Sequence, residues 1–87
     1  MNLRGRWWNR RWETGRRDIW LYAHDGSWLV TAKDGAGAAG RELTWPAFEQ
    51  EWQARAWVER LMNTAPGGRA DWKDMTKLVG GQPDRAG

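Results

Sequence analysis

The stretch DIWLYAHDGSWLVTAK, residues 18–33, has the pattern of two β-strands joined by a tight turn. Side chains alternate between two faces over residues 18–24, with a period of two that is typical of a strand with one buried face. The two faces carry Ile19, Leu21 and Ala23 on one side and Trp20, Tyr22 and His24 on the other. Asp25-Gly26 favours a type I′ turn, whose two central residues need positive φ. We therefore predict an antiparallel hairpin, with residues 27–33 as its second strand.

A long helix is predicted downstream of this hairpin. Residues 34–40, DGAGAAG, form a loop, and residues 41–45 are compatible with a short further strand. Pro46 presets φ for a first helical turn, and the pattern that follows it predicts a helix over residues 46–63. At 100° per residue, apolar side chains of this helix gather in one arc that we expect to dock on the sheet. They are Ala47, Ala54, Val58, Leu61 and Met62.

The C-terminal quarter of the chain predicts one more, shorter helix. Asp71 is suited to cap this helix at its N-terminus. One face of the helix would then carry Trp72, Met75 and Val79. Residues 80–87 have no pattern, and we expect them to be a disordered tail. The chain is therefore expected to form one small domain over residues 1–79, followed by that tail.

The stretch RGRWWNRRWETGRR, residues 4–17, precedes the hairpin and concentrates positive charge. It holds six of the eleven arginines and one acid, Glu13, so residues 1–17 carry a formal charge of +5. Residues 18–87 hold eight Lys and Arg against ten Asp and Glu, which gives a formal charge of −2. This division of charge suggests a class of binding partner rather than a reaction.

Alternation over residues 6–14 predicts a third strand with one drier and one wetter face. The two parities carry Trp8, Arg10 and Trp12 on one side and Trp7, Asn9, Arg11 and Glu13 on the other. Only one of these faces can meet the helix. If Trp8 and Trp12 are buried there, Trp7 is the exposed tryptophan. Together with the hairpin, this strand predicts an α+β fold: a three-stranded antiparallel sheet, one long helix packed on one face and a short C-terminal helix.

The composition argues against several classes of function. The chain has no cysteine, which rules out disulfides, thiolate metal sites and cysteine nucleophiles. Its single histidine, His24, lies near Ser27 at a predicted turn, but this turn lacks the glycine-framed elbow of a serine nucleophile. Its Asp and Glu residues are scattered and do not form a calcium-binding loop. We therefore expect no enzyme, no metal and no cofactor. No apolar run is long enough to span a bilayer and no signal segment follows the basic N-terminus, so we expect a cytoplasmic protein without membrane contact.

Binding is the function that the N-terminal stretch favours. Arginine suits phosphate because its planar guanidinium donates two parallel charge-assisted hydrogen bonds and keeps its charge at neutral pH. Tryptophan can stack on arginine or on an unpaired base. We expect a non-enzymatic nucleic-acid-binding accessory protein, of the kind that mobile elements encode, with DNA favoured over RNA. The expected nucleic-acid-binding residues are Arg4, Arg6, Trp7, Arg10, Arg11, Arg16 and Arg17.

Two alternatives stay open at this point. A basic, Trp-rich strand is also suited to an acidic protein partner or to a second copy of the chain, because Trp and Arg are enriched at interface hot spots. The chain would then be a protein–protein interaction or regulatory module, and in either class a monomer or a homodimer. In a purely structural interpretation, Trp8 and Trp12 belong to the core and the arginines only keep the strand solvated.

The order of elements is similar to that of a known family. Antiparallel strands precede one long helix, as in DIWLYAHDGSWLVTAK (18–33) and then RELTWPAFEQEWQARAWVERLM (41–62). This order, the Trp-rich sheet and a helix that opens after Thr or Pro resemble the small three-stranded, AP2-like DNA-binding domains at the N-termini of phage-type tyrosine recombinases. The resemblance covers roughly residues 6–62 and implies a sheet that lies in the DNA major groove. Those domains carry basic residues through the last hairpin. Here residues 35–40 are Gly and Ala, so groove contacts would come from the first strand and the first turn.

Overall fold

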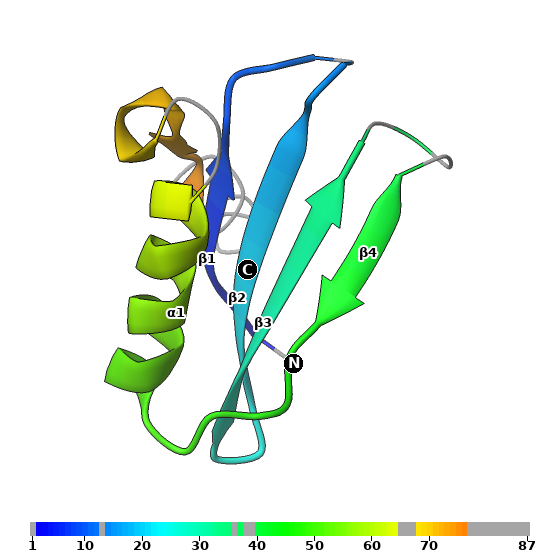
Figure 1. Cartoon of the computed structure of the whole chain (residues 1–87). Helices are drawn as coiled ribbons and strands as arrows, with labels where there is room; N and C mark the ends of the chain where they lie inside the picture. The colour runs from blue at the N-terminus through cyan, green and yellow to red at the C-terminus, as the bar shows by residue number, and fades with distance from the viewer. Residues whose placement is uncertain (1, 13, 36, 38–39, 65–67, 77–87) are drawn as a thin grey trace, which may run out of the picture.

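A computed structural model describes residues 2–12, 14–35, 37, 40–64 and 68–76. These residues form a five-stranded antiparallel sheet with one α-helix along one of its faces (Figure 1). The strands are β1 (Asn2–Trp8), β2 (Arg17–His24), β3 (Ser27–Asp34), β4 (Arg41–Thr44) and β5 (Lys73–Asp74), in the spatial order β4-β3-β2-β1-β5. The helix α1 spans Glu51–Thr64, and a 3-10 turn, η2, spans Arg69–Asp71. The predicted α+β class is confirmed, but the sheet has five strands rather than three.

The predicted hairpin is the centre of the sheet. β2 and β3 pair along their whole length, and Asp25 and Gly26 between them have φ angles of 48° and 77°. Two consecutive positive φ angles agree with the type I′ turn expected from the Asp-Gly dipeptide. On the face that meets α1, Ile19, Leu21 and Val30 are almost completely buried. The predicted grouping of Ile19 and Leu21 on one face is therefore confirmed, and the structure shows that this face is the core.

The first strand differs from its prediction in both extent and orientation. β1 ends at Trp8, and Arg10, with a φ of 66°, turns the chain out of the strand. Trp7 lies opposite Ile19 in the register and is 5% exposed, so it belongs to the core beside α1. Its indole occupies the space over Gly5, where a Cβ atom would collide with the ring. The interpretation in which Trp8 and Trp12 belong to the core is therefore wrong, because Gly5 makes room for Trp7 on that face.

Lys73–Asp74 form a strand within the segment where a helix was predicted. After η2 the chain runs along β1 as β5, and the amide of Met75 donates a 2.7 Å hydrogen bond to the carbonyl of Arg6. Pairing with the outer edge of β1 satisfies backbone groups on both strands, and it places Trp72 in the core at 5% exposure. Val79 and the tail expected over residues 80–87 lie outside the described part of the chain.

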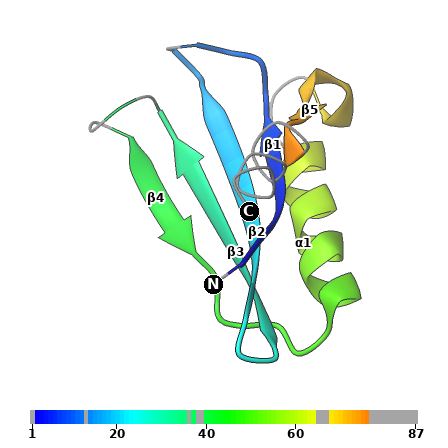
Figure 2. The ribbon, with the colours of Figure 1, turned by 180° about the vertical axis from the view of Figure 1, so that it is seen from behind.

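The long helix begins at Glu51 rather than at Pro46. Residues 45–50 instead cross the end of the sheet beside the β2–β3 turn, as Figures 1 and 2 show from opposite sides. There the backbones of Trp28 and Phe48 exchange hydrogen bonds of 2.9 and 2.8 Å, which hold this segment extended. The predicted docking arc is confirmed for Ala54, Val58 and Met62, which are buried, and for the partly buried Leu61, whereas Ala47 is exposed and precedes the helix.

Candidate functional site

The face of the sheet opposite α1 carries aromatic and charged side chains, and we call it the open face. Strand register places the following residues on it: Arg6, Trp8, Asp18, Trp20, Tyr22, Leu29, Thr31, Lys33, Glu42 and Thr44. Trp20 and Tyr22 lie on its central strand and are only partly buried. Burial raises the pKa of Tyr22, the charge of Glu42 adds to this rise and Arg6 opposes it. The open face therefore combines aromatic rings with charge.

Asp18 binds two arginines of the N-terminal stretch at one end of the open face. Its side chain is 3% exposed, and Oδ1 accepts a 2.6 Å hydrogen bond from Nη2 of Arg6. Oδ2 accepts a 2.9 Å hydrogen bond from Nε of Arg16. The hydrogen bond to Asp18 raises the pKa of Arg16 above its usual value, and burial opposes this rise in part. Both carboxylate oxygens are thus engaged, and the two guanidinium groups are fixed in place by one buried acid.

The same two arginines lie against tryptophan rings. The guanidinium carbon of Arg6 is 5.2 Å from the ring centroid of Trp20. The guanidinium carbon of Arg16 is 5.6 Å from the Trp8 ring and 5.8 Å from the Trp12 ring. The rings of Trp8 and Trp12 meet edge to face, with centroids 4.5 Å apart. Cation–π and aromatic contacts at these distances stabilise the arrangement, so Arg16 and the two tryptophans form one packed unit.

The connection between β1 and β2 is built on Asn9, a buried polar residue. Its Oδ1 accepts a 2.9 Å hydrogen bond from the amide of Arg17, and its Nδ2 donates a 2.8 Å hydrogen bond to the carbonyl of Gly15. Gly15 has a φ of 78° and Arg10 a φ of 66°, so both residues turn the chain through the left-handed region. Asn9 thereby fixes the two ends of the connection and leaves Trp12 between them, 69% exposed.

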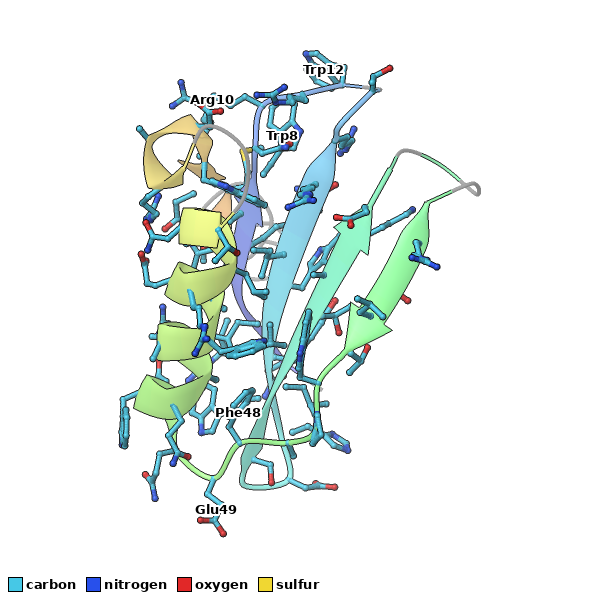
Figure 3. All side chains as sticks on the ribbon, viewed as in Figure 1. Trp8, Arg10, Trp12, Phe48 and Glu49 are labelled. Carbon is cyan, nitrogen blue, oxygen red and sulfur yellow. The ribbon has the colours of Figure 1, made fainter. Side chains whose placement is uncertain are left out.

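The candidate site is this end of the sheet. We call it the tip, and it consists of Trp8, Arg10, Arg11, Trp12 and Arg16. Figure 3 shows Trp8, Arg10 and Trp12 close together there, at the end of the molecule opposite Glu49. Trp12 and Trp52 are equally exposed, at 69% each. Arginines surround Trp12, whereas two glutamates, Glu49 and Glu51, precede Trp52 in the sequence.

Ion pairs divide the predicted arginines into two groups. Four of the six pair with a carboxylate: Arg6 and Arg16 with Asp18, Arg11 with Asp71 at 3.3 Å and Arg17 with Asp34 at 3.1 Å. Arg4 and Arg10 are exposed and form no ion pair with any residue that the structure describes. Arg4 lies about 13 Å along β1 from Trp8 at roughly 3.3 Å per residue, so the structure does not bring it to the tip.

The structure reverses the roles expected for two tryptophans. Trp7, predicted as the exposed stacking residue, is buried beside α1, and that prediction is wrong. Trp12 is the exposed indole instead, because β1 has ended before it. Sequence reasoning also missed Asp18 as the acid that holds the arginines. The alternation of the predicted hairpin strand could have placed it, because Asp18 is two residues before Trp20 and therefore lies on the same face. In the structure Asp18 lies on the open face, opposite Trp8 in the register.

The groups gathered at the tip are guanidinium donors and indole rings, which are suited to phosphates and bases. Within the described residues, no group of three or more His, Asp and Glu side chains is arranged to hold a metal ion. His24 and Asp25 approach to 3.4 Å, but they lie at the β2–β3 turn. Of the helices that the structure describes, none is long and apolar enough to cross a membrane.

Comparison of the chain with protein-family models, with curated proteins and with solved structures gave no match.

Proposed function

We propose that this protein binds nucleic acid without catalysing a reaction, by stacking Trp12 on an unpaired base and binding the neighbouring phosphates through arginines of the tip. The observation that carries this proposal is the 69% exposed indole of Trp12, held between Trp8 and Arg16. Stacking of one base on an aromatic side chain contributes about 1–3 kcal/mol and tolerates any base sequence. An unpaired base is accessible in a single strand, so we expect single-stranded DNA to bind more tightly than duplex.

Phosphate binding is supported by the state of the arginines around Trp12. Arg10 is exposed and unpaired within the described chain, so its guanidinium is available in full. The side chains of Arg11 and Arg16 are 48% and 25% exposed although each is paired with a carboxylate. A guanidinium has five N–H donors, and an ion pair that uses one or two of them leaves others for a phosphate. Asp18 reduces the net charge of the site but holds Arg16 in a fixed position, which lowers the entropy lost on binding.

Fluorescence anisotropy of a labelled single-stranded oligodeoxynucleotide at low salt tests this function. With about three phosphate contacts, the logarithm of the affinity should fall with the logarithm of salt concentration with a slope near −2. Trp12→Ala should weaken binding about tenfold or more, because it removes the stacking surface. Trp52→Ala is the matched control, since Trp52 is equally exposed and lies on α1. This variant should bind the oligonucleotide with the affinity of the wild type.

Three results would contradict the proposal: undetectable binding at low salt, binding that does not weaken as salt rises, or equal losses in Trp12→Ala and Trp52→Ala. Capture of an acidic protein by a chain that binds no oligonucleotide would instead favour the interaction-module function. Tighter binding to duplex than to single strand, with Trp12→Ala unaffected, would point to the sheet-in-groove mode implied by the resemblance to recombinase domains.

A further inference from the structure

β4 is an exposed strand at one edge of the sheet. All of its residues, Arg41–Thr44, are exposed, and Leu43 is 56% exposed although it is a large apolar side chain. β3 pairs with one side of β4, and β4 is the first strand in the order across the sheet. Figures 1 and 2 show it at the outer side of the sheet, away from α1. An edge of this kind presents backbone donors and acceptors that can pair with another strand.

The backbone groups of two residues of β4 point away from the sheet. The amide of Trp45 donates a 3.0 Å hydrogen bond to the carbonyl of Val30, so the backbone groups of Trp45 face β3. The direction of these groups alternates along an antiparallel strand. The N–H and C=O groups of Leu43 therefore also face β3, whereas those of Glu42 and Thr44 face outward. The outer edge of β4 thus offers two donors and two acceptors.

An apolar hollow of about 150 Å³ lies beside this edge, on the α1 side of the sheet. Its lining includes the apolar side chains of Ala32, Leu43, Trp45 and Leu61, and Arg17, Asp34 and Arg41 also border it. α1 packs mainly against β2 and β3, so the α1 side of β4 extends beyond the helix. Among the described residues, Leu43 is therefore the point at which an open backbone edge and uncovered apolar surface meet.

We propose that β4 pairs antiparallel with β4 of a second copy of this chain, so that the two sheets become one. Residues directly opposite each other in an antiparallel pair lie on the same face. A two-fold axis perpendicular to the sheet must therefore pass midway between the two copies of one residue, which lie opposite each other. Only Glu42 and Leu43 are central enough in β4 to take this position and keep most of the strand paired. The charge pattern of β4 decides between these two registers.

An axis through Leu43 is the favourable register. It places the two copies of Leu43 opposite each other, where each covers the other's exposed side chain, and it sets the outward backbone groups of Glu42 against those of Thr44. Arg41 of each copy then lies opposite Trp45 of the other, where a cation–π contact is available. An axis through Glu42 would place two carboxylates directly opposite each other, and like charges in that position are destabilising.

Disulfide trapping tests both the pairing and its register. The chain has no cysteine, so a single introduced cysteine reports one contact. The two Leu43 residues would form a non-hydrogen-bonded pair with Cβ atoms about 4.5–5.5 Å apart, close to disulfide distance. On oxidation, Leu43→Cys should form a covalent dimer, twice the 10.1 kDa chain mass, at least about tenfold faster than Glu42→Cys. Trp52→Cys is the control for random collision, because Trp52 is exposed on α1.

Faster trapping of Glu42→Cys than of Leu43→Cys would overturn the register, and rates equal to that of Trp52→Cys would overturn the pairing itself.

Sedimentation equilibrium gives an independent readout on the unmodified chain. We expect a reversible dimer that Leu43→Lys converts to a monomer and Trp52→Lys does not, with circular dichroism confirming that both variants are folded. A wild-type chain that stays monomeric up to about 1 mM would also contradict the pairing. Glu42 and Leu43 lie on β4, which β3 and β2 separate from β1, and Trp52 lies on α1, so none of the substituted residues belongs to the tip.

Discussion

The two faces of the sheet hold their tryptophans by different forces. On the α1 side, Trp7 is buried among apolar side chains, and its position depends on apolar packing and on the space above Gly5. On the open face, Trp8 is partly exposed and lies against Arg16, which is fixed by the buried carboxylate of Asp18. The difference shows how one strand places two neighbouring tryptophans. One face is a hydrophobic core, and the other is an aromatic layer whose geometry depends on one ion-paired acid.

Alanine substitution of the two neighbouring tryptophans should separate the faces most clearly. Trp7→Ala should lower the free energy of unfolding by about 3–5 kcal/mol, because it removes a buried indole and leaves a cavity. Trp8→Ala should cost only about 1–2 kcal/mol, since its ring is partly exposed and loses one edge-to-face contact, one cation–π contact and the hydrogen bond that its Nε1 donates to the Arg11 carbonyl. Urea denaturation followed by circular dichroism measures both values. Equal losses of stability would contradict the difference between a buried hydrophobic face and a partly exposed aromatic face.

Removal of the carboxylate charge of Asp18 should have the next largest effect. Asp18→Asn keeps the shape of the side chain but leaves Arg6 and Arg16 without their counter-charge, which should cost about 1–3 kcal/mol of stability. Asp34→Asn is the matched control, because the Asp34 side chain is 56% exposed in its pair with Arg17. Exposed pairs contribute roughly 0–1 kcal/mol. If the two variants were equally stable, the buried acid would not be what organises the open face.

Local sequence signals predicted the parts of the fold that depend on neighbouring residues. The Asp25-Gly26 turn and the alternation of β2 were correct because turn geometry and strand period are properties of a short segment. The docking face of α1 was correct for the same reason. The start of α1 was missed because the Phe48 backbone pairs with Trp28, a contact between segments far apart in sequence. β5 was missed similarly, since it exists only by pairing with β1.

The sequence indicated the segment that contains the tip but not the arrangement of its side chains. The tip lies within residues 4–17, the stretch that its charge indicated, yet tryptophans at both odd and even positions of that stretch meant that alternation alone could not identify its core face. The core face of β1 is set by Gly5, which leaves space for the Trp7 ring, and only the three-dimensional structure shows this contact. The acids that pair with the arginines lie at positions 18, 34 and 71, so the number of available guanidinium groups could not be counted from the stretch itself.

The most direct test of the tip is to observe which indole N–H groups respond when an oligonucleotide is added. The nine tryptophans give nine indole signals in a ¹⁵N-correlated NMR spectrum, and single substitutions assign them. We predict that the Trp12 signal shifts most and the Trp8 signal next, while the signals of the buried Trp7 and of the equally exposed Trp52 stay in place. Saturable binding that shifts Trp52 as much as Trp12, or that leaves Trp12 unmoved, would contradict the assignment of the tip as the nucleic-acid-binding site.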